Sequence, residues 1–386
     1  MQLVEFGSIM NMAKGKKPAN QSPEKRDGFM PYVDIKAFET NTIENYTDGV
    51  KCLPCNEGDI LIVCDGSRSG LVGKAINGYV GSTLAKITAD GMTQNYLYYF
   101  LQGKYALLNT KKKGTGTPHL NPDLLKKQML VVPSIPEQER IVTRIEELFS
   151  ELDKAVETLQ TTKQQLAVYR QAVLKEAFEG DYPKVQLKEI STTISGYAFK
   201  SKKYTPDGEY IVVKIGNVKE RHFDFSRSLT RTNEADGNIL DKYLLRHGDC
   251  LITLTGSRGK RDYGYVTMID KESNYLLNQR VARLRFDETK ALPEYFQYYL
   301  SSPDYRNKFF SYETGNVGQG NVGIKALWEP TILLPSIEEQ KEIVQEIESR
   351  LSVCESIERI VDTALAQADA MRQSILKQAF EGGFNQ

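Results

Sequence analysis

Two loops in this chain carry residue types that suit contacts to phosphate groups and to base edges. The sequence DGSRSG covers residues 65–70, and TGSRGKRDYG covers residues 255–264. Glycine and serine let the backbone approach a surface closely, and arginine presents a planar fork of donors that matches phosphate oxygens or guanine. The candidate contact residues in these loops are Ser67, Arg68, Ser257, Arg258, Lys260 and Arg261.

Two further loops lie later in each half of the chain. KKKGTGTPHLN begins at Lys111, and GNVGQGNVG begins at Gly315. Loops rich in Gly, Asn, Gln and Lys can contact both backbone and base edges, although an ordinary hairpin turn is the alternative interpretation of each. The candidates here are Lys111, Lys112, Lys113, Thr117, His119, Asn316, Gln319 and Asn321. Tyr197 and Lys200 are added as an aromatic near a basic residue, with packing as the alternative for the tyrosine.

The sequence shows no recognisable catalytic motif. It contains no P-loop, no glycine-rich dinucleotide loop opening a helix, and neither HExxH nor GxSxG. The three histidines are not at metal-ligand spacing, and Asp and Glu concentrate on helical segments, where a solvated face explains them. Cys52 and Cys55 form a CxxC, which is half of a zinc site. Redox or metal use and ordinary free thiols both stay open for this pair, and no catalytic residue or metal site is predicted.

The loops belong to a unit that is written twice in the chain. Residues 133–180 and 335–382, which open on PSIPEQERIV and PSIEEQKEIV, share 20 identities in 48 positions at an offset of 202. Earlier segments also match, among them GDILIVCDGSR from Gly58 with GDCLITLTGSR from Gly248. The offset grows along the chain, so the second copy has longer loops. The sequence therefore predicts a head-to-tail duplication of one unit of roughly 190 residues.

Each copy divides into a strand-rich part and one long helix. Short apolar or alternating runs separated by Gly, Asp and Asn predict strands in residues 1–132 and 185–334. Residues 133–184 and 335–386 each predict a single helix of roughly 40 residues, about 60 Å long. Ser134 with Glu137 and Ser336 with Glu339 have capping-box spacing, and Gly180 and Gly382 suit left-handed helix ends. The predicted fold is α+β with mainly antiparallel sheets in two domains, plus two long helices.

Both helices carry apolar residues in a 3-4 alternation, which is typical of a coiled-coil seam. The seam could join two chains or pair the helices within one chain. We favour internal antiparallel pairing, because each helix is the only obvious partner of matching length. This would relate the copies by an approximate two-fold axis and separate the two α+β domains. The predicted seam residues are Ile145, Leu148, Leu152, Leu159, Leu166, Tyr169, Ile347, Ile357, Val361, Met371 and Ile375, with Leu351 replacing Arg350.

The charges follow the same division. The net charge of the whole chain is zero. The two strand-rich blocks, residues 1–132 and 185–334, each carry +4, whereas the helical blocks carry −3 and −5. The repetition of this pattern favours an anionic partner for the strand-rich blocks. Five cysteines without a regular framework and the lack of a membrane-length apolar run predict a cytoplasmic protein.

Together these residues resemble the specificity subunit of type I restriction-modification systems. The segments that carry the resemblance are VVPSIPEQERIVTRIEELFSELD, LLPSIEEQKEIVQEIE, both AFEG helix ends, and ISGYAFKSKKY from Ile194. The loop-then-PS arrangement after Gly114 and Gly315 adds to them, so the resemblance covers nearly the whole chain. The departures are the CxxC at Cys52, Arg350 in the seam, and a longer polar stretch over residues 219–246. The bases that are read therefore cannot be inferred.

The resemblance implies a function and a set of partners. Each strand-rich domain would be a target-recognition domain that reads one half of a split double-stranded DNA sequence. The paired helices would act as a spacer and dock two modification subunits, which use S-adenosylmethionine to methylate adenine. A restriction subunit would use ATP and Mg²⁺ to translocate DNA, and this chain itself would hold no cofactor. Two other hypotheses are a DNA enzyme with an unrecognised active site and a coiled-coil adaptor that binds proteins.

Overall fold

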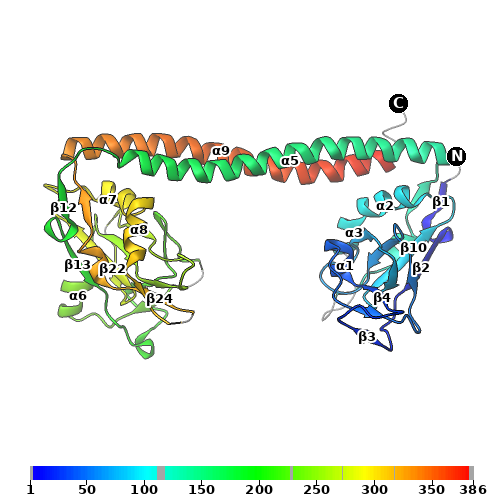
Figure 1. Ribbon diagram of the computed structural model, residues 1–386, viewed down its shortest axis with the longest axis horizontal. Coiled ribbons are helices and arrows are strands. Elements are labelled where there is room, and N and C mark those ends of the chain that lie inside the picture. Colours follow the sequence, from blue (N-terminus) through cyan, green and yellow to red (C-terminus); the bar gives the residue numbers. More distant parts are fainter. Residues whose placement is uncertain (1–2, 111–117, 227–228, 272, 317, 382–386) are drawn as a thin grey trace. The chain divides into compact units, whose positions relative to one another are not determined.

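The chain divides into two compact units, which are described separately. The first unit contains Met1–Gln160 and Asp362–Gln386, and the second contains Thr161–Val361. Each unit holds an α+β domain and parts of the two long helices, α5 (Ile135–Ala177) and α9 (Ile337–Phe380) (Figure 1). The structure is a computed structural model that describes residues 3–110, 118–226, 229–271, 273–316 and 318–381.

Both units are built on the same four-stranded antiparallel sheet (Figure 1). In the first unit the order is β2-β10-β7-β8, formed by Met10–Lys14, Leu84–Ala89, Ile60–Val63 and Val72–Lys74. In the second it is β13-β22-β18-β20, formed by Ser191–Ser195, Val281–Phe286, Cys250–Thr253 and Val266–Met268. Every residue of β7 and β18 is buried, as expected of short apolar runs. The predicted duplication and fold class are confirmed.

Smaller sheets complete each domain. In the first unit the order is β3-β5-β4-β9-β6, formed by Gln21–Ser22, Tyr46–Thr47, Met30–Val33, Gly78–Val80 and Pro54–Cys55. The second has β17-β14-β21 and the pair β15-β16, formed by Arg231–Thr232, Tyr210–Val213, Tyr275–Leu277, Val218–Lys219 and His222–Phe223. Among the described strand pairs, only β4-β9 and β14-β21 run parallel.

A two-stranded sheet joins the start of each copy to the strand before its long helix. β1 (Leu3–Glu5) pairs with β11 (Met129–Val131), and β12 (Lys184–Gln186) pairs with β25 (Thr331–Leu333). Short helices pack against the sheets of each domain. They are α1 (Ile35–Thr40), α2 (Gln94–Gly103), α3 (Tyr105–Thr110), α4 (Asp123–Lys126), α6 (Gly237–Tyr243), α7 (Pro293–Tyr299) and α8 (Pro303–Ser311). No helix within the described ranges is long and apolar enough to cross a membrane.

A buried glutamine fixes the first turn of each long helix to its α+β domain. The Gln138 side chain donates to the carbonyls of Gly91 (2.7 Å) and Pro133 (3.0 Å), and its Oε1 accepts from the Thr93 N–H (2.8 Å). Both this side chain and that of Gln340 are fully buried. These three bonds satisfy both ends of the amide, so its burial carries no unpaired polar group.

Gln340 repeats this arrangement in the second unit. It donates to the carbonyls of Lys290 and Pro335 (both 2.9 Å) and accepts from the Leu292 N–H (2.8 Å). Gln138 and Gln340 are the last residues of the repeated PSIxEQ motif. The motif therefore marks a structural joint between helix and domain.

The helix ends match the sequence expectations only in part. Ser336 and Glu339 form the predicted capping box, with bonds from the Ser336 N–H to Glu339 (2.8 Å) and from the Glu339 N–H to the Ser336 hydroxyl (3.3 Å). Among the described contacts, Ser134 has no such reciprocal pair. The left-handed end at Gly180 is wrong, because α5 stops at Ala177 and Gly180 lacks a positive φ. Gly382 lies outside the described residues.

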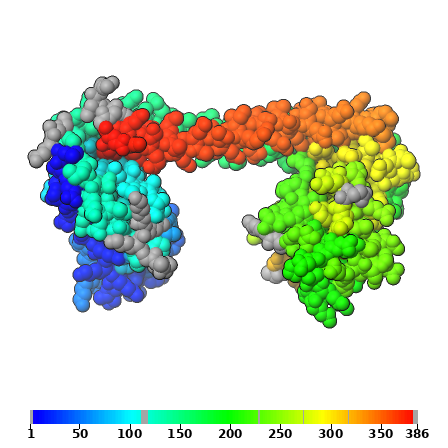
Figure 2. Space-filling model, turned by 180° about the vertical axis from the view of Figure 1, so that it is seen from behind, coloured from blue at the N-terminus to red at the C-terminus, as the bar shows by residue number. Residues whose placement is uncertain are grey.

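In the first unit, the beginning of α5 packs antiparallel to the end of α9. Ile145, Ile375 and Leu376 share one buried cluster with aromatic residues of α2. Asp153 of α5 pairs with Arg372 of α9, and the Arg372 guanidinium lies 4.9 Å from the centre of the Phe149 ring. Figure 2 shows the red C-terminal turns of α9 seated against the cyan part of the first domain.

In the second unit, the end of α5 packs antiparallel to the beginning of α9. Val173 and Ile347 belong to one buried cluster with the second domain. Arg170 pairs with Glu358 at 2.7 Å. Arg350 pairs with Glu176 at 3.0 Å and also donates to the Tyr169 hydroxyl at 3.2 Å, so Arg350 bridges the helices from outside the seam.

The predicted seam has the right seven-residue period, but three of its predicted positions are wrong. Positions seven residues apart on α9 are buried, at Ile347, Cys354, Val361, Ala368 and Ile375. The intervening contact comes four residues after these positions, whereas the sequence prediction placed it three residues after. Tyr169, Ile357 and Met371 are therefore exposed by 43%, 37% and 53%, while Leu351 is buried. Leu148, Leu152 and Leu159 are half-buried, because two helices alone cover only part of a seam side chain.

Replacing Gln340 by alanine should destabilise the second unit. The change would remove the amide that binds the partly buried Leu292 N–H and two carbonyls, which costs about 1–3 kcal/mol of unfolding free energy. Urea unfolding and amide exchange at Leu292 measure the effect. Gln345→Ala is the matched control, because Gln345 is exposed on the same helix. Equal stability of the two variants would contradict the proposed joint.

Two neighbouring residues of α9 test the phase of the seam. Val361 is 3% exposed and Ile360 is 67% exposed. Val361→Asp places an unpaired carboxylate in the seam and should reduce the unfolding free energy by about 3–5 kcal/mol. Ile360→Asp should change it by less than about 0.5 kcal/mol. Thermal unfolding of the isolated chain distinguishes them, and the opposite ranking would refute this helix register.

Candidate nucleic-acid interface

In each unit the structure pairs the two candidate loops through their backbones. The paired residues are equivalent in the two copies. In the first unit, Asp65 and His119 form an isolated antiparallel bridge. In the second, Thr255 pairs with Asn321 where β19 (Thr255–Gly256) lies against β24 (Gly320–Val322). When the two copies are aligned, Asp65 corresponds to Thr255 at an offset of 190 residues, and His119 corresponds to Asn321 at an offset of 202. The paired loops are therefore equivalent in the two copies.

A carboxylate organises the loop pair of the first unit. Asp65 accepts from the Lys14 ammonium and contacts His119 Nδ1, both at 2.8 Å. Burial by itself raises the pKa of Asp65, but the bonds from Lys14 and His119 outweigh it, so that this pKa lies below its usual value. The Gly66 N–H donates to the Pro118 carbonyl at 2.8 Å. His119 is thus held at the loop surface and half exposed.

Arg68 sits beside this loop pair and is engaged by an acidic side chain. It forms an ion pair with Glu39 of α1, and its own side chain is 54% exposed. Ser67 lies next to it in the same loop. The candidates Lys111, Lys112, Lys113 and Thr117 fall outside the described residues.

The loop pair of the second unit forms a three-stranded sheet, β19-β24-β23, in which β23 is Glu313–Thr314. Arg258 donates to the Gly315 carbonyl at 2.6 Å, so its guanidinium braces the two loops against each other. Glu313 accepts from the Tyr263 hydroxyl at 2.7 Å, and burial together with this carboxylate raises the pKa of Tyr263. The two loops approach closely at Gly320, where a Cβ would lie 2.5 Å from Glu313 Oε1 and 3.1 Å from the Arg258 Cα.

Polar side chains gather on the outer surface of this sheet. Arg261 has a positive φ of 53° and donates to Asn307 Oδ1 at 2.9 Å. The Ser257 N–H donates to Asp262 Oδ1 at 2.7 Å. Within the described contacts, Lys260 has no ion-pair partner. The exposed members of the set are Arg258, Lys260, Arg261, Asn316, Gln319 and Asn321.

Two candidates lie outside these loop pairs. Tyr197 packs edge-on against Phe199 and also contacts Tyr243, with ring centres 4.9 and 5.5 Å apart. It therefore has the packing role that was the alternative interpretation. Lys200 is exposed and donates its N–H to Glu234 at 3.4 Å. Conversely, no sequence pattern pointed to Lys14, Glu39 or Glu313, because each comes from a segment distant in sequence from the residue that it contacts.

The cysteine pair does not form a metal centre with its surroundings. Cys55 is buried and donates to the Ile76 carbonyl at 3.5 Å, and burial raises its pKa to about 11. Burial also raises the pKa of the half-buried Cys52. In the part of the chain that the structure describes, no group of three or more His, Cys, Asp or Glu could hold a metal ion. Free thiols are the interpretation that these contacts favour.

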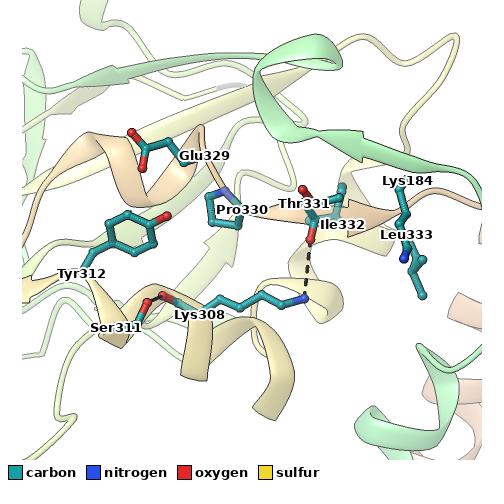
Figure 3. A pocket seen from close by; sticks show the side chains of 9 residues that line it. All are labelled: Lys184, Lys308, Ser311, Tyr312, Glu329, Pro330, Thr331, Ile332 and Leu333. Atoms are coloured by element: carbon teal, nitrogen blue, oxygen red, sulfur yellow. Dashed lines mark hydrogen bonds between the residues drawn. The ribbon is translucent and has the colours of Figure 1, made fainter.

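An open cavity of about 680 Å³ lies in the second unit (Figure 3). Its side chains come from the end of α8, from β25 and from Lys184 of β12. Lys308 pairs with Asp304 at 2.6 Å and reaches toward the Thr331 carbonyl at 3.5 Å. Burial, followed by a hydrogen bond to Glu329, raises the pKa of Tyr312. The polar groups here are engaged with one another, so the loop pairs remain the candidate functional site.

Comparison with known proteins identifies the family to which the chain is similar. The family model described as the type I restriction modification DNA specificity domain matches residues 1–166 and 179–360. The chain is 28% identical over 371 residues to the type I restriction enzyme MjaVIII specificity subunit of Methanocaldococcus jannaschii, covering 90% of this chain and 85% of the relative. It is 23% identical to the EcoBI specificity subunit of Escherichia coli, covering 98% and 85%.

Two solved structures share the fold. One is a chain from a study of complex assembly and conformational transition of the type I R-M system, with a TM-score of 0.73 and 18% identity, covering 98% of this chain and 97% of that one. The other is the HsdS subunit from Thermoanaerobacter tengcongensis, with a TM-score of 0.58 and 18% identity, covering 99% and 96%.

Proposed function

The chain belongs to the family of type I restriction-modification DNA specificity proteins, and we propose that it reads a bipartite double-stranded DNA target with two similar domains. Residues 1–132 would read one half-site and residues 185–334 the other. The observation that carries this proposal is the duplicated loop pair, which joins Asp65 to His119 and Thr255 to Asn321. Equivalent surfaces in both copies are what two separate readers of DNA require.

The chemistry of the loops supports contact with DNA. Arg258, Arg261 and Lys260 are exposed beside asparagine and glutamine side chains, which together can bind phosphates and the edges of guanine and adenine. The two strand-rich blocks each carry a net charge of +4. This modest charge is sufficient if partner subunits complete the grip on the DNA.

The long helices would set the distance between the two readers. A helix of 43 residues is about 65 Å long, and half-sites on one face of DNA lie roughly 34 Å apart for each helical turn. The helical blocks are acidic, at −3 and −5. We propose that they face partner proteins, namely two modification subunits, with restriction subunits added in the full enzyme.

Catalysis would belong to those partners. The sequence carries no recognisable catalytic motif, and the described residues contain no group of three or more His, Cys, Asp or Glu that could hold a metal ion. Methyl transfer from S-adenosylmethionine and ATP-driven translocation would then take place in the modification and restriction subunits. This chain would supply the sequence recognition that directs both reactions.

Exchanging residues 1–132 for the corresponding block of a relative with another target tests the two-reader proposal. The methylated sequence should change in one half only, because the other reader is untouched. Mapping methylated adenines in cells that express the complex measures both halves at once. The reciprocal exchange of residues 185–334 is the control and should change the other half. A change in both halves from a single exchange would refute the proposal.

Lys260→Gln should weaken binding to DNA without changing the sequence that is preferred. Removing one phosphate contact reduces the slope of log affinity against log salt by about 0.9. A salt series with the assembled complex measures this slope. Lys341→Gln is the control, because it removes the same charge from an exposed position at the start of α9. Equal slopes for both variants would show that Lys260 does not lie on the duplex.

A further inference from the structure

We propose that Asn109 and Arg306 are positioning residues for sequence recognition, one for each domain. Neither belongs to the loops that would touch DNA. Each lies on the short helix behind a loop, α3 in the first unit and α8 in the second, and fixes the loop by donating hydrogen bonds to its carbonyls. The inference rests on the proposed function and adds residues that would determine its specificity.

Asn109 holds the loop of the first unit through its amide group. Its Nδ2 donates to the carbonyls of Ser67 (3.0 Å) and Ser69 (3.1 Å). Ser69 is itself fully buried, and its hydroxyl donates to the Gly66 carbonyl at 2.7 Å. One side chain from α3 therefore determines the direction of the carbonyls on both sides of Arg68.

Arg306 performs the same task in the second unit with a guanidinium. It donates to the carbonyls of Gly264 (2.7 Å), Arg261 (3.1 Å) and Tyr263 (3.1 Å). The guanidinium also lies over the Phe310 ring, 5.2 Å from its centre. These bonds direct its donors toward the loop backbone rather than toward solvent. The guanidinium therefore holds the loop in one conformation.

The two anchors reach the same point of the duplicated fold. The carbonyls of Ser69 and Tyr263 each precede a glycine with positive φ, Gly70 at 94° and Gly264 at 70°. A helix side chain also lies close to each glycine. A Cβ on Gly70 would lie 2.6 Å from Leu108 Cβ, and one on Gly264 would lie 2.9 Å from Phe309 Cε1.

Both copies thus bind the carbonyl before the equivalent glycine, but with different side chains from different positions of the helix. Asn109 makes two bonds to a short loop, and Arg306 makes three to a loop that is four residues longer between the equivalent arginine and glycine. A glycine-rich loop that is not anchored would have to be ordered when DNA binds, and it could adapt to incorrect bases. An anchored loop holds its reading side chains in one geometry, so that mismatches are penalised.

The test is selection of bound duplexes from a randomised library by the full chain assembled with its methyltransferase partner. The wild-type complex should select two half-sites, which establishes the proposed function independently. Arg306→Gln should reduce base discrimination at the second half-site by about tenfold and leave the first unchanged. Asn109→Ala should do the reverse. Arg306→Lys, which keeps charge and some donors, should recover part of the discrimination.

Matched controls separate positioning from charge and from folding. Lys308→Gln removes a positive charge from α8, where Lys308 pairs with Asp304 instead of the loop. Thr110→Ala alters the residue after Asn109, whose hydroxyl bonds only within α3 in the described contacts. Both controls should retain wild-type discrimination. If the Arg306→Gln domain fails to fold, Arg306→Lys and Asn109→Ala still decide the matter.

The inference is overturned if the wild type selects two half-sites and both anchor variants select them equally well. It is also overturned if either variant weakens both half-sites to the same extent, or if Lys308→Gln matches Arg306→Gln. A wild-type complex that selects no bipartite sequence would instead refute the proposed function, so the two failures can be told apart.

Discussion

The structure depends on a buried amide that ties each domain to its long helix. Gln138 and Gln340 each bind two carbonyls and one N–H, and both glutamine side chains are fully buried. Burying a polar side chain is costly unless every donor and acceptor is paired. The geometry that pairs them is narrow, so the bonds fix the direction of the helix relative to its own domain.

Constancy at this joint contrasts with variation in the loops. The partners of Gln138 and Gln340 match at offsets of 199 and 202, so that every bond of the joint is repeated. The loop pairs of the two copies share one equivalent backbone pairing. The side chains that anchor the loops, and the lengths of the loops, differ between the copies. A protein that reads two different half-sites needs this division, because the frame must stay the same while the reading surface changes.

The sequence predicted the features that repeat and missed those that depend on tertiary contacts. Central strands such as Ile60–Val63 were evident from apolar runs, and the helices from their periodicity. The seam phase was wrong because steps of three and four residues alternate in both arrangements, and only packing against the partner distinguishes them. Tyr197 was assigned to a surface role because nothing local shows that Phe199 and Tyr243 surround it. Asn109 and Arg306 were missed because their partners lie about 40 residues earlier in the chain.

Polar residues within the seam explain how the helices keep one alignment. In the second unit Arg170 meets Glu358, and in the first unit Asp153, which follows the seam residue Leu152, meets Arg372. Half-exposed ion pairs add little stability, but a shift by one heptad would separate both pairs and bring charges against apolar side chains. Small residues such as Ala368 and Cys354 accept neighbouring registers more readily than large ones. The charged pairs therefore supply the specificity of alignment that this small-residue seam lacks.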